Sequence, residues 1–136
     1  MMALSQGHAA CPEEGGSLRL ADLRGETFIL YADRANARSL DPVLRFFELT
    51  GFTPAKTISI GDLSAALGLV AAGIGVSVVP SAAMLMRRDG VTYVDLNEPG
   101  AVSPIVLSVL HASDQTMMTD VLAELRRLSI SGPMGD

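Results

Sequence analysis

The stretch SAALGLVAAGIGVSVVP, residues 64–80, decides the fold class of this 136-residue chain. It lies in an uncharged segment, residues 63–86, that is long enough to be tested as a membrane span, which needs about 20 apolar residues. Three glycines and Pro80 interrupt the segment, and neither a basic cluster nor an aromatic belt flanks it. The pattern therefore predicts a small-residue helix that ends at Gly73, followed by a buried strand over residues 76–79.

A strand that is hydrophobic on both faces is typical of a parallel sheet covered by helices. Strands are also predicted over residues 27–31, 56–60 and 91–96, with a short helix over residues 81–86. This alternation of strands and helices builds right-handed crossovers. The sequence therefore predicts an α/β fold with a mostly parallel sheet of about five strands flanked by helices.

The helix between the first two of these strands has clear start and stop signals. Asp41 and Pro42 suit the cap and first helical position, and Gly51 suits the end. The spacing of Val43, Phe46 and Phe47 places them on one face, which is predicted to pack on the sheet. The next helix is predicted to be capped by Asp62 or Ser64.

The two ends of the chain are predicted to differ from its middle. Residues 1–17 are small, polar and glycine-rich, and are predicted to form a flexible leader, while residues 131–136 form a loose tail. A strand over residues 104–111 and a helix over residues 115–128 are predicted before that tail. The helix carries an apolar stripe made of Met118, Val121, Leu122, Leu125 and Leu128.

Ligands of parallel α/β sheets bind just outside the carboxyl ends of the strands. Three predicted loops occupy those ends, and two of them lead to helix starts, whose free N–H groups favour an anion. Asp33 and Arg34 fit ligand contact and a solvated loop equally well, and Asp62 is first a helix cap. The candidate binding residues are Tyr31, Ala32, Asp33, Arg34, Gly61, Asp62, Leu63, Pro80 and Ser81.

Composition argues against several functions. The net charge is −5, Lys56 is the only lysine, and no helix-turn-helix pattern is present, so the chain itself is not expected to bind DNA. His8 and His111 have no obvious relay partners, and no metal-ligand spacing occurs, so neither a catalytic residue, a metal site nor a cofactor is predicted. Cys11 is the single cysteine, which fits a reducing compartment, and the absence of a signal-peptide pattern predicts a cytoplasmic location.

Several segments together resemble the effector-binding domain of LysR-type transcriptional regulators. They are FILY at residues 28–31, LGLVAAG at 67–73, GVSVVP at 75–80 and SPIV at 103–106, preceded by LADLRGETFI at 20–29. The resemblance extends over about residues 18–128, and it is nearest to the branch that governs the catabolism of aromatic compounds.

The resemblance implies a lobe of the periplasmic-binding-protein type (type 2). Residues 18–104 would form the second lobe of an effector-binding domain. Residues 105–130 would supply the returning strand and final helix of the first lobe, most of which this chain lacks. The implied effector is a small molecule, such as an aromatic acid or a dicarboxylate, bound between the lobes, and the helix-turn-helix domain that binds DNA would lie outside this chain.

The resemblance also implies that the helix over residues 115–128 packs on the lobe this chain lacks, so its apolar stripe needs another cover. Either the helix folds back on its own lobe, or a second copy covers it in a homodimer, which we favour because residues 97–103 are long enough to act as a hinge. Two other functions remain as alternatives. A solute-binding protein of the periplasmic type would share the fold, and a small α/β enzyme would share the sheet but lacks an evident nucleophile.

Overall fold

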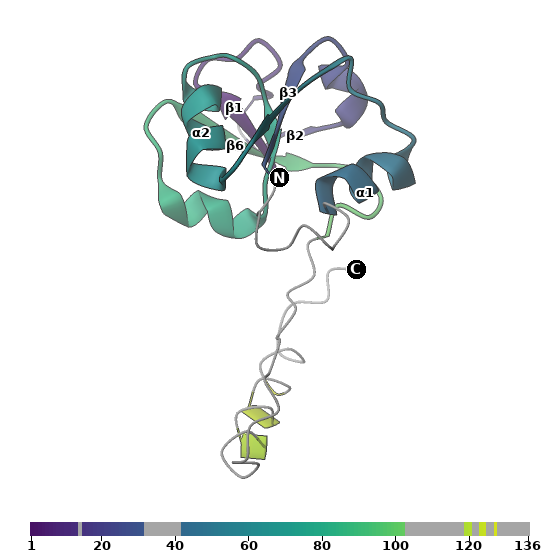
Figure 1. The fold of residues 1–136 in the computed structure, drawn as a ribbon, viewed down its shortest axis with the longest axis vertical. Coiled ribbons are helices and arrows are strands. Elements are labelled where there is room, and N and C mark those ends of the chain that lie inside the picture. The colour runs from purple at the N-terminus through teal and green to yellow at the C-terminus, as the bar shows by residue number, and fades with distance from the viewer. Residues whose placement is uncertain (14, 32–41, 103–118, 121–122, 125–126, 128–136) are drawn as a thin grey trace. The chain divides into compact units, whose positions relative to one another are not determined.

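The computed structural model describes residues 1–13, 15–31 and 42–102, and five residues nearer the C-terminus, Thr119, Asp120, Ala123, Glu124 and Arg127. The chain divides into two compact units, Met1–Pro104 and Ile105–Asp136. The first unit contains the sheet and helices that are labelled in Figure 1.

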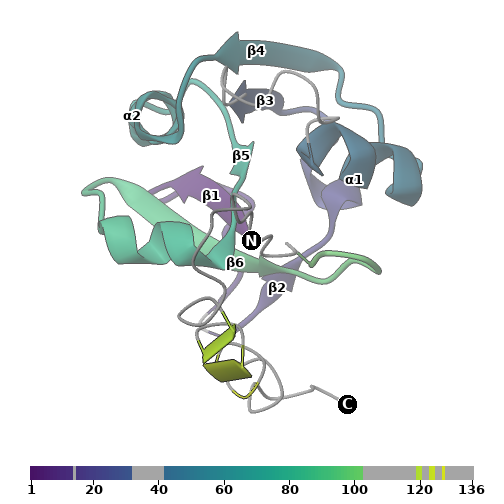
Figure 2. The same ribbon diagram turned by 60° about the horizontal axis from the view of Figure 1, so that its bottom comes forward.

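In the first unit, the described residues form the strands β1 (Met2–Ser5), β2 (Ser17–Leu18), β3 (Thr27–Tyr31), β4 (Lys56–Ile60), β5 (Ser77–Val78) and β6 (Val91–Leu96). One hydrogen-bonded set has the order β2-β6-β1-β5, and β3 pairs with β4 in parallel. A parallel bridge between Phe28 and Val76 joins the two sets. Figure 2 shows the segment that contains β5 running from the side of β3 and β4 to the side of β1 and β6. Apart from β1, these strands run in the same direction, which confirms the predicted mostly parallel α/β sheet.

Strand β1 contradicts the predicted flexible leader. Met2, Ala3 and Leu4 are each 0% exposed, and β1 lies between β5 and β6, antiparallel to both. The backbone pairs Ala3 with Ser77 on one side and with Tyr93 on the other. The prediction for residues 1–17 was therefore wrong at its start, because three apolar residues and a serine form a central strand once both neighbours pair with them.

The described residues of this unit also form the α-helices α1 (Pro42–Thr50) and α2 (Leu63–Ala71) and the 3-10 helices η1 (Leu20–Leu23) and η3 (Ser81–Met86). Both α-helices end at the predicted glycines, with φ of 66° at Gly51 and 72° at Gly73. After α2, the N–H of Ile74 donates to the carbonyl of Leu69 and that of Gly73 to Val70. These two hydrogen bonds satisfy carbonyl groups in the last turn of the helix. They require a residue in the left-handed conformation, which glycine adopts without strain.

The alternation of side chains along the strands separates two apolar cores. Phe28 and Leu30 of β3 pack with η1 and α1, whereas Ile29 packs with α2 and η3. The first core gathers all four phenylalanines of the chain, with Phe28 in edge-to-face contact with Phe47 at a centroid distance of 5.3 Å. As predicted, α1 buries Val43, Phe46 and Phe47. The sheet is thus covered on both faces, as a strand apolar on both sides requires.

The C-terminal segment is described only in part. Thr119, Asp120, Ala123, Glu124 and Arg127 are helical and exposed, as expected for the polar face of the helix predicted over residues 115–128. The predicted strand over residues 104–111, the apolar stripe and the tail lie outside the described residues. Among the residues that are described, no helix is long and apolar enough to cross a membrane.

Candidate functional site

The carboxyl ends of three strands meet at one edge of the sheet. Tyr31 ends β3 directly beside Ile60 of β4. The parallel bridge at Val76 gives β5 the same direction, so Pro80 and Ser81 follow it at the same edge. The structure therefore brings together six of the predicted binding residues: Tyr31, Gly61, Asp62, Leu63, Pro80 and Ser81. Ala32, Asp33 and Arg34 lie outside the described residues.

The described residues of this edge combine an apolar base with a polar rim. Tyr31, Leu63 and Pro80 are half-buried, and the first two pack against the core formed by Ile29, Val79 and helix α2. Asp62 and Ser81 are exposed. An aromatic ring, an apolar side chain and polar groups on one rim suit a small ligand with an apolar body and a polar group.

Asp62 is the N-cap of α2, which decides between the two caps, Asp62 and Ser64, that the sequence had predicted. Its Oδ1 accepts the backbone N–H of Ala65 at 2.8 Å. The carboxylate therefore already occupies the positive end of the helix dipole. This changes the predicted role of the helix start, because an anionic ligand here would meet a negative charge as well as free N–H groups.

The amino group of Met1 lies at the same edge, since it donates to the carbonyl of Val79 at 3.0 Å. Burial lowers the pKa of this amino group, and the nearby Asp95 carboxylate partly offsets the shift.

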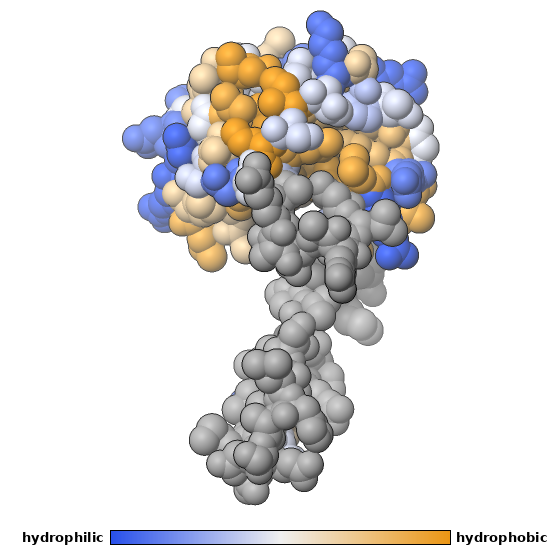
Figure 3. Space-filling model, in the orientation of Figure 1, coloured by the Kyte–Doolittle hydropathy of each residue, from blue (hydrophilic) through white to orange (hydrophobic). Residues whose placement is uncertain are grey.

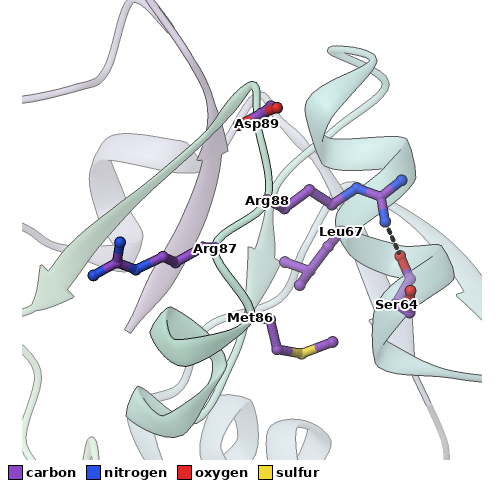
Figure 4. A pocket seen from close by; sticks show the side chains of 6 residues that line it. All are labelled: Ser64, Leu67, Met86, Arg87, Arg88 and Asp89. Carbon is purple, nitrogen blue, oxygen red and sulfur yellow. Dashed lines mark hydrogen bonds between the residues drawn. The ribbon is translucent and has the colours of Figure 1, made fainter.

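A separate hollow of about 420 Å³ lies between α2 and the turn after η3 (Figure 4). Arg88 crosses it and donates to the carbonyl of Ser64 at 3.4 Å, whereas Arg87 points the other way. A side chain at Gly68 would meet the Arg88 guanidinium at 3.1 Å, so the small residue leaves room for this contact. The sequence had given no sign that Arg88, an arginine at the end of one helix, would contact another helix.

Hydrophobic side chains are also exposed beside that hollow. Met84 and Met86 are each 48% exposed and Leu85 is 85% exposed, all on η3. Figure 3 shows hydrophobic surface at the lower left, where η3 lies. These residues are distinct from the candidate binding edge, and sequence reasoning did not single them out.

The other chemistry-bearing residues lie away from the edge. The Nδ1 of His8 accepts the N–H of Ala10 at 3.1 Å, and its Nε2 lies 3.6 Å from a carboxylate oxygen of Glu26. Cys11 packs beside the first apolar core. Within the part of the chain that the structure describes, no group of three potential ligands could hold a metal ion. His111 lies outside that part.

Comparison with known proteins identifies relatives of this fold and sequence. The model of the LysR substrate binding domain matches residues 1–128. The HTH-type transcriptional regulator CatR of Pseudomonas putida is 40% identical over 97 residues, which are 71% of this chain and 34% of CatR. The chain thus spans about a third of that relative.

Solved structures agree with this match. The effector binding domain of a BenM variant superposes with a TM-score of 0.81 at 27% identity, covering 93% of this chain and 59% of that one. The BenM effector binding domain with its effector benzoate has a TM-score of 0.75 and covers 98% of this chain and 62% of that one; at 24% identity, this likeness shows the fold alone.

These findings confirm the resemblance read from the sequence, including its closeness to regulators of aromatic catabolism, and the type 2 periplasmic-binding-like fold. The relatives are transcriptional regulators, so the enzyme alternative is not supported, nor is the solute-binding one. A match over residues 1–128 also includes β1, which the sequence reading had assigned to a leader. The chain belongs to the LysR substrate-binding domain family.

Proposed function

We propose that this chain is the effector-binding part of a LysR-type transcriptional regulator and that it senses a small aromatic carboxylate. The observation that carries the proposal is the convergence of Tyr31, Asp62 and Ser81 at one edge of a sheet of this family. That edge is where a parallel sheet accepts ligands. Benzoate, the effector named for a BenM domain of the same fold, supports an aromatic acid as the first ligand to test.

The remainder of the proposal concerns the whole regulator. Its DNA contacts would belong to a helix-turn-helix domain outside this sequence, and it would act in the cytoplasm. Support comes from the transcriptional regulators to which the chain is similar. A dicarboxylate is the second effector class to test, because the resemblance read from the sequence implied either an aromatic acid or a dicarboxylate.

The location is tested by titrating the ¹⁵N-labelled chain with benzoate and recording amide chemical shifts. We expect shifts at Tyr31, Gly61 and Ser81, and weaker shifts with benzamide, which keeps the ring but lacks the charge. The amide of Gly25, on the loop between η1 and β3, serves as an internal reference. Shifts confined to the hollow around Arg88, or none with benzoate or a muconate-like diacid, would contradict this location.

Replacement of Asp62 tests the sign of charge that the edge accepts. Asp62→Asn keeps a cap for the N–H of Ala65 but removes a negative charge. We expect benzoate to bind a few-fold more tightly, because a like charge at contact distance costs on the order of 1 kcal/mol even in water. Asp62→Ala is the control for the cap and should lower stability by about 1 kcal/mol. Arg34→Ala should weaken binding, whereas unchanged affinity in both Asp62→Asn and Arg34→Ala would rule out an anion at this edge.

We also propose that the apolar stripe of residues 118–128 mediates self-association. Burying such side chains contributes roughly 1.5–3 kcal/mol each, so leaving them in water is unfavourable. Sedimentation at micromolar concentration should then show a dimer that Leu122→Asp with Leu125→Asp dissociates. Ala123→Asp, at an exposed position of the same helix, should leave the dimer intact. A monomer whose final helix is protected from hydrogen exchange would favour the fold-back arrangement instead.

A further inference from the structure

The sheet has a seam between β3 and β5. Strand β3 pairs with β4 through five consecutive residue pairs, but the regular pairing of β3 on its other side is a single bridge between Phe28 and Val76. Two backbone hydrogen bonds form that bridge, from Ile29 N–H to the Val76 carbonyl at 2.8 Å and from Val76 N–H to the Thr27 carbonyl at 2.9 Å. The residues that follow, Ser77 and Val78, pair with β1 instead.

This seam is also the point where the order of strands reverses. The chain goes from β3 to β4 on one side and then crosses back through α2 to β5 on the other side of β3. In open α/β sheets, ligands bind in the crevice at such a reversal, outside the carboxyl ends of the strands. The spacing of β3 and β5 beyond the bridge therefore sets the spacing between Tyr31 and Ser81 at the candidate edge.

Ser77 bonds across the seam immediately after the bridge. Its side chain is 0% exposed, and it is the polar residue that the described part of the chain buries completely. The hydroxyl donates to the carbonyl of Ile29 at 2.7 Å. In a regular parallel ladder, that carbonyl would accept the backbone N–H of Val78, two residues beyond Val76. The Ser77 hydroxyl thus satisfies the Ile29 carbonyl, and leaving that carbonyl buried without a hydrogen-bond partner would cost free energy.

The approach of the two segments is tight at the other end of the bridge. A Cβ added to Gly75 would lie 2.2 Å from the carbonyl oxygen of Thr27. The backbones are therefore in close contact at Gly75, and two residues later the contact is made by a side chain. Ser77 and Ile29 lie three and two residues before Pro80 and Tyr31, so this contact sits roughly 7–10 Å behind the candidate edge.

We propose that Ser77 is a positioning residue for effector binding: its hydroxyl, held on the Ile29 carbonyl, fixes the separation of β3 and β5 and so the spacing between Tyr31 and Ser81 at the candidate edge. The part of this inference that concerns affinity rests on the proposed function. The part that concerns the seam rests on the geometry of Ser77, Ile29 and Val76 alone.

The test compares Ser77→Ala with Thr50→Val in the full 136-residue chain. The Thr50 hydroxyl likewise donates to a backbone carbonyl, that of Phe46 at 2.9 Å, but at the end of α1 and away from the seam. Thr50→Val is therefore a matched loss of one hydroxyl hydrogen bond. Ser77→Cys keeps the size of the side chain and a weak donor, and replaces Ser77→Ala if the alanine variant fails to fold.

Amide hydrogen exchange measures how often the hydrogen bonds between β3 and β5 open. In Ser77→Ala we expect the Ile29 amide to exchange about tenfold faster than global stability predicts, together with shifted resonances at Tyr31 and Ser81, while Leu4 in the β1–β6 ladder follows global stability. Thr50→Val should change these amides only through global stability. Uniform acceleration in both variants, with unshifted resonances at the edge, would overturn the proposal.

Benzoate titration then separates the two proposals. Ser77→Ala should raise the dissociation constant for benzoate several-fold, and Thr50→Val should leave it unchanged. Equal affinity in both variants, despite an altered seam, would reject the positioning role. If benzoate fails to bind the wild-type chain, the proposed effector class is rejected, and the exchange of Ile29 still decides whether Ser77 fixes the seam.

Discussion

Gly75→Ala should remove a large part of the stability of the first unit. The added Cβ would lie 2.2 Å from the carbonyl oxygen of Thr27 and 3.1 Å from its carbon, both backbone atoms of β3. Relief requires β3 to move away from residues 75–76, which breaks the two hydrogen bonds between β3 and Val76. We expect a loss of about 3 kcal/mol or more in the free energy of unfolding, a large part of the roughly 5–15 kcal/mol typical of a domain.

Urea denaturation followed by circular dichroism measures this loss. Gly61→Ala is the matched control, because a Cβ at Gly61 meets no atom within 4 Å and its φ is not in the left-handed region. Its free energy of unfolding should stay within about 0.5 kcal/mol of the wild-type value. Equal denaturation midpoints for Gly75→Ala and the wild-type chain would show that the close contact with Thr27 is absent in solution.

Leu4→Ala should cost about 2–5 kcal/mol, the usual range for a leucine truncated in a core. Leu4 is 0% exposed, and it packs with Leu23 and Phe28 among others in the first core. The same substitution in a flexible leader would cost nothing measurable, so the variant distinguishes a central strand from a leader. Thermal and urea denaturation both report the change.

Leu85→Ala is the control, because it makes the same leucine-to-alanine change at an exposed position. Leu85 is 85% exposed on η3, so its truncation should change stability by less than about 0.5 kcal/mol. Proteolysis adds a second measurement, because a paired strand resists cleavage and a leader does not. Rapid cleavage within residues 1–5, combined with wild-type stability of Leu4→Ala, would restore the leader interpretation and remove β1 from the sheet.

The elements that the sequence predicted best have signals within their own residues. Helix α1 has Pro42 at its first position and a glycine after its last turn, and its buried residues follow the helical period. Strands β3, β4 and β6 were predicted with the bounds that the structure shows. The shared direction of these strands also predicted that Tyr31, Asp62 and Ser81 lie at one edge, because parallel strands have their carboxyl ends on the same side of a sheet.

The candidate site was predicted less completely than its location. Asp62 was expected to cap α2, and it does, but its carboxylate thereby places a negative charge where an anion had been expected. The contact of Arg88 with Ser64 was not predictable, because the two residues lie 24 positions apart and meet only when η3 and α2 pack. The widths of crevices and hollows depend on such distant contacts.

The sequence by itself determined the α/β class, the helix ends and the carboxyl edge, because apolar periodicity, caps and glycines act over a few residues. The tertiary structure alone decided that Met2–Ser5 is a strand, because its partners lie more than 70 residues away in the chain. It also divided the apolar run at residues 76–79, giving Val76 to β3 and Ser77–Val78 to β1. A run apolar on both faces fixes burial but not partners, and pairing follows from which backbone groups remain to be satisfied when the strands meet.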